Sequence, residues 1–207
     1  PVNGPLFTAS ANSRSTVHVN EYVPGTMVST LVTSTDGGQV IAERAMYMYR
    51  TIDGKWGSHD SVGILTPSSI WYLPEGYTGP GFDEWVLVQN PNARQVTVEV
   101  RFLTPSGLGK QFDITVPAQS RYTIHVNDHL QNTDVATRLE SKTLEGGKPL
   151  PVYAERAMYM INTPDGKVGA HDSIGLSAVR NTWYMPEGTT RPGFDMWVLV
   201  MNPGEER

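Results

Sequence analysis

The sequence predicts an all-β fold made of tandem antiparallel β-sandwich repeats, each about 110 residues long. Composition is one reason: Gly (20) and Pro (15) are frequent, only 18% of residues are charged, and no segment shows a sustained helical apolar period. Repetition is the other, because the heptapeptide AERAMYM occurs at both Ala42–Met48 and Ala154–Met160. At 207 residues, the chain is long enough to bury a core without disulfides.

The repeat extends well beyond this heptapeptide. Aligning Ala42 with Ala154, an offset of 112, gives an ungapped match of 51 positions with 32 identities. Upstream, SRSTVHVN (Ser13–Asn20) matches SRYTIHVN (Ser120–Asn127) at an offset of 107. The offsets differ because the loop TLEGGKPLP is longer than its counterpart TDGGQ, and surface loops tolerate such changes.

These offsets divide the chain into one whole unit and two partial ones. Residues 1–70 are expected to be the C-terminal part of one β-sandwich repeat, 71–181 a complete repeat, and 182–207 the N-terminal strands of a further repeat. The two partial units together lack a counterpart of Val96–Gly107. The chain is therefore expected to be a piece of a larger protein, or a subunit whose ends pair with those of its neighbours.

Strand patterns support a sandwich within the complete unit. Val96–Phe102 alternates apolar and polar residues strictly, as a strand with one wet face does. The run Trp85–Val88 is continuously apolar, which suits a central strand covered on both faces. Further alternating segments are Phe112–Val116, Tyr122–Val126 and Val135–Leu139, and the hairpin turns are Asp53-Gly54 and Asp165-Gly166. Seven or eight short strands per repeat predict a sandwich of immunoglobulin or fibronectin-III type.

Composition also narrows the function classes. The formal net charge is −5 and there is no basic run, so nucleic acid is not an expected partner. No apolar stretch reaches the length of a membrane span, so no membrane insertion is expected in this segment. The absence of Cys excludes disulfides, thiol catalysis and Cys-ligated metal. No cofactor is expected.

The charged residues of the repeated motifs are interpreted as structural. They are Glu43, Arg44, His59, Asp60 and Glu75, with Glu155, Arg156, His171, Asp172 and Glu187 in the next copy. On a strand, AERAMYM places one charge on each face, which favours an ion pair at the margin of a core over a ligand site. In HDS, consecutive residues point to opposite faces and cannot form a relay, and the chain has neither GxSxG nor HExxH. No catalytic residue, metal ligand or enzyme activity is therefore predicted. An enzyme would need a concave pocket gathering His59, Asp60, Glu75 or Asp83.

Aromatic residues gather around WYLPEG and the following strand. Trp71, Tyr72 and Trp85 either fill the core and clamp the joint between repeats, which is the favoured interpretation, or form an exposed platform for sugar rings. The second alternative predicts that their rings lie flat on the surface.

The blocks AERAMY, WYLPEG and SRYTIHVN also resemble a known but uncharacterised immunoglobulin-like β-sandwich repeat. It occurs in tandem in large secreted or surface proteins of actinobacteria, Chloroflexota and other, often thermophilic, bacteria. The resemblance implies an extracellular or cell-surface location and an architectural or adhesive role, and it carries over no catalytic residue. This chain departs from the pattern by beginning and ending inside a repeat.

The predicted function is a structural module of a bacterial surface protein: a stalk, a spacer or a filament subunit. Its expected partners are neighbouring copies of the repeat, in the same chain or in a homopolymer assembled head to tail by strand addition. A glycan-binding or adhesive module that recognises surface glycans is the alternative.

Overall fold

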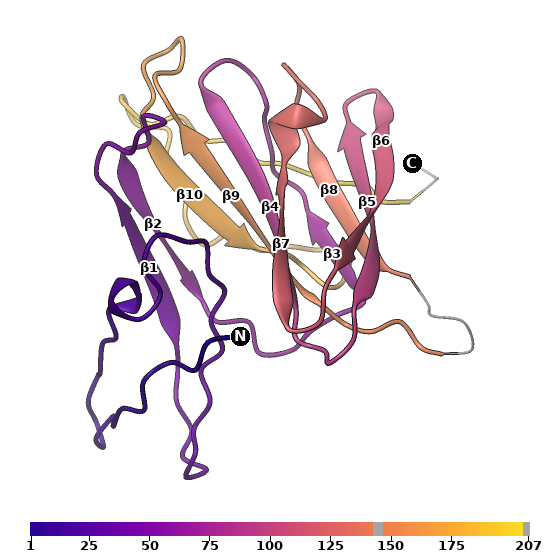
Figure 1. Ribbon diagram of the computed structural model, residues 1–207. Helices are drawn as coiled ribbons and strands as arrows, with labels where there is room; N and C mark the ends of the chain where they lie inside the picture. Colours follow the sequence, from indigo (N-terminus) through magenta and orange to yellow (C-terminus); the bar gives the residue numbers. More distant parts are fainter. Residues whose placement is uncertain (143–146, 205–207) are drawn as a thin grey trace.

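A computed structural model describes residues 1–142 and 147–204, so the loop TLEGGKPLP lies partly outside the described residues. The described chain is all-β, with two short 3-10 helices, η1 (Val19–Glu21) and η2 (Val126–Asp128). At its centre, two four-stranded antiparallel sheets pack face to face (Figure 1). The β5 sheet has the order β3 (Ile70–Leu73), β8 (Ala136–Ser141), β5 (Val96–Thr104), β6 (Gly107–Val116). The β4 sheet has the order β10 (Gly169–Ile174), β9 (Tyr153–Met160), β4 (Phe82–Asn90), β7 (Ser120–His125).

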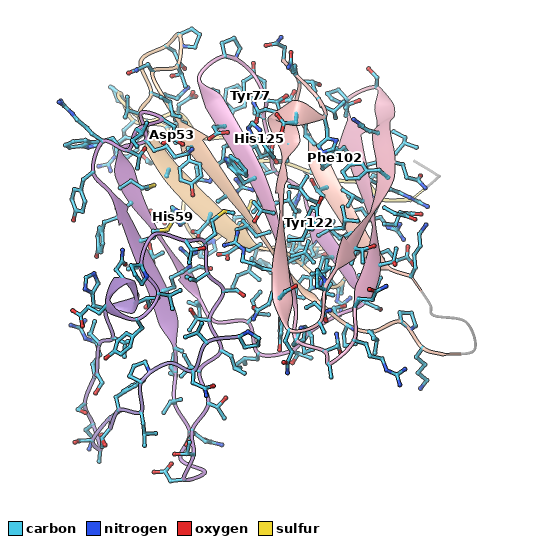
Figure 2. All side chains as sticks on the ribbon, viewed as in Figure 1. Asp53, His59, Tyr77, Phe102, Tyr122 and His125 are labelled. Atoms are coloured by element: carbon cyan, nitrogen blue, oxygen red, sulfur yellow. The ribbon has the colours of Figure 1, made fainter. Side chains whose placement is uncertain are left out.

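The core is formed by the inward residues of both sheets. On β5 the predicted alternation is confirmed: Val98, Val100 and Phe102 are fully buried, and Phe102 lies between the sheets (Figure 2). On β4 the inward Val86 and Val88 are buried. Trp85 and Leu87, which alternate with them along the strand, face outward and are half-buried. The expectation that this run is fully covered on both faces is thus met on one face only. The outer face is covered only in part, by side chains such as Lys55, whose Nζ lies 5.7 Å from the centroid of the Trp85 ring.

The strand order corrects the predicted immunoglobulin type. In that type the first strand pairs with the second, and the seventh pairs with the sixth. Here the first strand of the sandwich, β3, pairs with the sixth, β8, and the seventh, β9, pairs with the second, β4. These two strands have therefore exchanged sheets relative to the immunoglobulin order, while the antiparallel sandwich itself is retained.

Outside the sandwich, the described residues contain one further pair of strands, β1 (Glu43–Met48) and β2 (Gly57–Val62). Residues 182–204 form no strand, although their counterparts in the complete copy form β3 and β4. A strand needs a neighbour to pair its N–H and C=O groups. In the sandwich β8, β7 and β9 supply that pairing, and residues 182–204 have no such neighbour.

Local conformations nevertheless recur between the copies. η1 and η2 are counterparts at the offset of 107, and residues with positive φ recur at matching positions. These pairs are Asn12 and Gln119, Gly25 and Asn132, Arg50 and Asn162, Gly54 and Gly166, Gly57 and Gly169, and Gly81 and Gly193. The turns are thus specified by short segments, whereas the strands depend on their partners.

The β1–β2 hairpin packs against β9 and β10 at one side of the sandwich (Figure 1). A Cβ added to Gly57 would lie 3.3 Å from the Cα of Gly169, so the two hairpins approach closely at their glycines. On β1–β2, Arg44, Met48 and His59 belong to the face turned toward the sandwich, and Tyr47 belongs to the outer face.

Replacing Phe102 with alanine removes the largest fully buried aromatic ring of the core. We expect Phe102→Ala to lower the free energy of unfolding by about 3–5 kcal/mol, measured by urea denaturation. Leu108→Ala, at a side chain that is 59% exposed at the start of β6, is the control and should change it by less than about 0.5 kcal/mol. Equal effects of the two substitutions would contradict the core as described.

Candidate functional site

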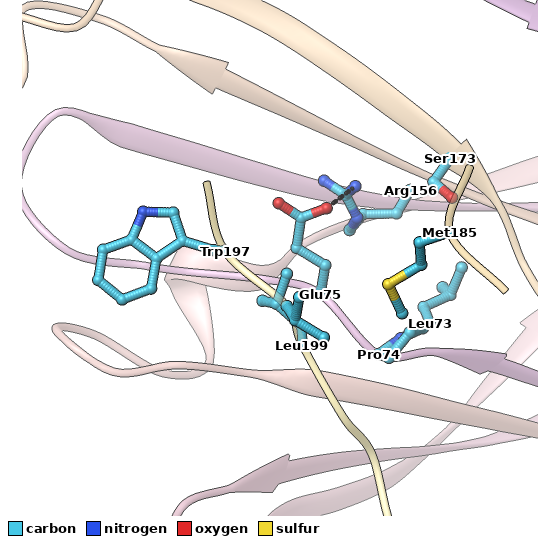
Figure 3. A pocket seen from close by; sticks show the side chains of 9 residues that line it. Leu73, Pro74, Glu75, Arg156, Ser173, Met185, Trp197 and Leu199 are labelled. Atoms are coloured by element: carbon cyan, nitrogen blue, oxygen red, sulfur yellow. Dashed lines mark hydrogen bonds and ion pairs between the residues drawn. The ribbon is translucent and has the colours of Figure 1, made fainter. Parts of the chain in front are cut away.

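A buried arginine lies at the end of the sandwich where β3 leads into PEG. Arg156 on β9 is 1% exposed, and its Nη2 donates a hydrogen bond of 2.6 Å to Oε2 of Glu75 (Figure 3). His171 on β10 lies beside the pair, with Nδ1 3.3 Å from Arg156 Nη2 and Nε2 3.5 Å from Glu75 Oε1. Burial lowers the pKa of His171, and the charge of Glu75 opposes that effect. The sequence-predicted residues Glu75, Arg156 and His171 therefore form one cluster, which we call the inner cluster.

Strand register explains why a charged side chain lies inside. Arg156 pairs with Val86 across β9 and β4, so it shares the inward face of the sheet with that core valine. Glycine is required at position 76, because an added Cβ would lie 2.2 Å from Glu84 Oε1 and 2.5 Å from the carbonyl oxygen of Val135. The PEG sequence thus places a carboxylate opposite the arginine and leaves room for a second carboxylate behind it.

That second carboxylate belongs to Glu84, a residue that sequence analysis did not single out. It is fully buried on β4, and burial raises its pKa to about 8; the charge of Arg156 lowers the pKa in part and the charge of Glu75 raises it further. Glu84 is therefore protonated at neutral pH. Its counterpart in the next copy is Met196, so a carboxyl group at this position is not a general feature of the repeat.

The same arginine–histidine pair recurs on the β1–β2 hairpin with different carboxylates. Arg44 Nη1 lies 3.3 Å from His59 Nδ1, the separation found between Arg156 and His171. Arg44 Nη2 bonds Glu155 Oε1 at 2.7 Å and also contacts Asp172, and His59 Nδ1 lies 2.9 Å from Asp172 Oδ2. We call this the joint cluster. It links the first partial copy to the outer face of β9 and β10.

The electrostatics of the joint cluster follow from its partial burial. Burial raises the pKa of Glu155, and Arg44 opposes that effect. The pKa of Asp172 is lowered, because its bonds to Glu155, Arg44 and His59 outweigh its burial. Burial acts to lower the pKa of Arg44, but Glu155 and Asp172 raise it overall. The cluster thus joins Arg44 to two carboxylates whose pKa values are shifted in opposite directions.

A lysine contact between adjoining copies occurs twice, and sequence analysis missed it. Lys55 Nζ lies 2.7 Å from Asp83 Oδ2, and Lys167 Nζ lies 3.0 Å from Asp195 Oδ2. Both members of the second pair are the counterparts of the first at the offset of 112. Lys55 also lies over two rings, 4.8 Å from the centroid of Tyr159 and 5.7 Å from that of Trp85. The sequence does contain a sign of this contact, because the repeated DGK block carries the lysine and the repeated PGFD block carries the aspartate.

The aromatic residues are placed differently from a sugar-binding platform. Trp71 is 3% exposed and its Nε1 donates to the carbonyl oxygen of Val152 at 2.8 Å, so its assignment to an exposed platform is wrong. Tyr72 is half-buried on β3. Trp85 is half-buried as well, with its ring stacked on His125 at 4.3 Å. Trp71 is buried in the core, whereas Tyr72 and Trp85 are half-buried, so the three rings do not form one exposed surface.

Other predicted residues lie apart from these clusters. Glu43, Asp60 and Glu187 are exposed. The structure does not gather His59, Asp60, Glu75 and Asp83 in one cavity: His59 contacts Asp172, Asp60 faces solvent, and Glu75 and Asp83 have the partners given above. A cavity of about 390 Å³ at the inner cluster is lined by Leu73, Glu75 and Arg156, and on its other side by Met185, Trp197 and Leu199 (Figure 3). Roughly half of its wall is thus an irregular segment rather than the sandwich.

Within the described residues no group of three or more His, Asp or Glu side chains is arranged to hold a metal ion. The same residues include no helix long and apolar enough to cross a membrane.

Comparison with known proteins finds similarity among solved structures. No family model and no curated protein matches the chain. Among solved structures, the chain is similar to that of Thermotoga maritima 1070, with a TM-score of 0.47 and 12% identity over 55% of this chain and 97% of that one. It is also similar to the Anabaena sensory rhodopsin transducer, with a TM-score of 0.36 and 22% identity over 44% of this chain and 97% of that one. With identities and TM-scores this low, neither similarity carries a functional argument.

Glu84 should make stability depend on pH. Because its folded pKa of about 8 lies above its ordinary value of 4.5, its stabilising effect is complete below about pH 4.5 and is lost as the pH rises through 8. We expect Glu84→Met to be more stable than the wild type at pH 8.5. The difference should shrink by up to about 1.4 kcal/mol per pH unit toward pH 5, in urea denaturation. The control Glu43→Gln should follow the wild type, and parallel curves for Glu84→Met and wild type would contradict the assignment.

The two counterpart arginines should differ in their effect on stability. Arg156→Met removes a guanidinium that is 1% exposed and leaves Glu75, whose side chain is 30% exposed, without its cation, so we expect a loss of about 2–3 kcal/mol in the free energy of unfolding. Arg44→Met removes a side chain that is 40% exposed, and its most buried partner, Asp172, keeps its contact of 2.9 Å with His59, so we expect about 1 kcal/mol or less. Chemical denaturation of both variants compares them directly. A larger loss for Arg44→Met would mean that the joint cluster, and not the inner one, is the critical ion pair.

Proposed function

We propose that this chain is a structural, extracellular repeat module: a stretch of a stalk, spacer or filament on a bacterial surface. The observation that carries the proposal is the recurring lysine contact. Lys55 of one copy reaches Asp83 of the next, and Lys167 of that copy reaches Asp195 of the one after. A contact that recurs at the repeat offset is expected of units stacked in series, because each joint then reuses the same surface.

The use of the repeated motifs supports this proposal. Trp71 is buried in the core, and Glu75 and Arg156 form the ion pair of the inner cluster. Arg44 and His59 contact the next copy through Asp172. Most of the charged groups of AERAMYM and HDS thus have an architectural contact. The proposed tandem unit is an immunoglobulin-like sandwich only in the loose sense that its strands are antiparallel and alternate between two sheets. The extracellular setting rests on the resemblance of the repeated blocks to the uncharacterised repeat of secreted and surface proteins of bacteria.

We propose neighbouring copies in series as the main partners. Two contacts support this arrangement: the joint cluster, which links Arg44 and His59 to Glu155 and Asp172, and the lysine contact, which recurs at the offset of the repeat.

The joint can be tested in the full chain, which has no cysteine to interfere with labelling. Spin labels at Tyr47→Cys on the hairpin and Leu108→Cys on the sandwich, both at exposed positions, report the distance between them. We expect one narrow distance distribution that broadens in Lys55→Met. Amide exchange of β1 and β2 should become about tenfold faster in that variant, since a partly buried ion pair over two rings is lost.

Lys148→Met, at an exposed lysine, is the matched control and should leave both readouts unchanged. A broad distance distribution in the wild type, or an identical one in Lys55→Met and wild type, would overturn the proposed joint.

A further inference from the structure

A second cavity, of about 420 Å³, lies between the facing edges of the two sheets, where β6 and β7 run past each other. Its wall carries three aromatic rings, from Trp85, Phe112 and Tyr122, and Tyr122 is 40% exposed on β7 (Figure 2). The other two rings are held in place by stacking: Trp85 on His125 at 4.3 Å, and Phe112 on His129 at 4.4 Å. The cavity thus has rigid aromatic walls and one accessible ring.

Two polar atoms of the lining residues, Nε1 of Trp85 and Nδ1 of His129, are buried without a hydrogen-bond partner, and neither presents accessible surface to the cavity. The polar groups open to a ligand are instead the carboxylates of Asp113, which is 46% exposed, and Asp128, which is 73% exposed. Burial lowers the pKa of His129, and the charge of Lys110 lowers it further.

The charges around the cavity are already compensated. Asp113 forms an ion pair of 2.6 Å with Lys142, and Asp128 lies 2.9 Å from Nδ1 of His125. His125 is also held from its other nitrogen by Asp83 at 2.8 Å. A charged ligand would have to displace one of these partners, whereas a neutral ligand with several hydroxyl groups could add hydrogen bonds to the carboxylates as they stand.

The cavity is particular to the complete copy. At the offset of 107, Arg121 and His125 have the identical counterparts Arg14 and His18. In contrast, Phe112, Tyr122 and His129 correspond to Pro5, Ser15 and Tyr22. The architecture of the repeat therefore does not require these three side chains, and their presence together around one cavity calls for a different explanation.

We propose that this cavity binds a neutral saccharide. The apolar C–H face of a sugar ring lies against Tyr122 and Phe112, and its hydroxyl groups bond the exposed carboxylates of Asp113 and Asp128. Trp85 is shared with the lysine contact between copies and with the predicted WYxPEG platform, but Trp71 and Tyr72 take no part in this site. The proposal stands whether or not the chain is an architectural module.

Affinity electrophoresis of the full chain tests the proposal, with gels containing a soluble neutral β-glucan, a mannan, a galactan or, for comparison, anionic polygalacturonate. We expect at least one neutral polymer to retard the protein, with affinity at least about tenfold weaker in Tyr122→Ser. Tyr122 is 40% exposed on the edge strand β7, so the fold should tolerate this change. Tyr47→Ser, at a tyrosine 64% exposed on the outer face of β1, is the matched control and should bind like the wild type.

Spectroscopy supplies a second readout. Binding of the retarding polymer should change the tryptophan emission, and Trp85→Phe should abolish the change while the other tryptophans remain. Retardation by none of the neutral polymers, which means that the cavity holds only water, overturns the proposal. So do equal binding by wild type and Tyr122→Ser, and binding of polygalacturonate alone.

Discussion

The ion pair between Arg156 and Glu75 is the interaction on which the rest of the structure depends. A guanidinium group that is 1% exposed must have a carboxylate beside it, since an unpaired buried charge would cost more than the fold can supply. That need fixes the segment after β3 against β9 and so ties the edge of the β5 sheet to the β4 sheet. Burial of the same region raises the pKa of Glu84, and glycine is required at position 76 because Glu84 and the carbonyl oxygen of Val135 lie so close to it.

The arginine–histidine pair occurs in two different surroundings. On β9 and β10 it closes its own sandwich through Glu75, and on β1 and β2 it attaches to Glu155 and Asp172 of the neighbouring copy. The same face of the hairpin is used in both cases, so the choice of carboxylate decides whether the hairpin completes one unit or joins two. This explains how identical sequences can serve both the inside of a repeat and the contact between repeats.

Sequence patterns predicted the parts of the fold that are determined locally. The alternation in Val96–Phe102 gave β5, and the turns with positive φ recur because a few residues specify them. The patterns could not predict that residues 182–204 lack strands, because pairing depends on distant partners. In the candidate sites, Arg156 and Glu75 were named from their motifs, whereas Glu84 and Lys55 were missed. Their roles come from three-dimensional neighbours: the inner cluster for Glu84, and the rings of the next copy for Lys55.

The loop that carries the joining lysine is itself held rigid. In both copies a threonine bonds an aspartate two residues on and accepts from the backbone of the lysine, as Thr51 does with Asp53 and Lys55 and Thr163 does with Asp165 and Lys167. In the proposed stack, a lysine presented by the same loop to the same aspartate would help to place each unit alike on the one before it. Units placed alike in series trace a superhelix.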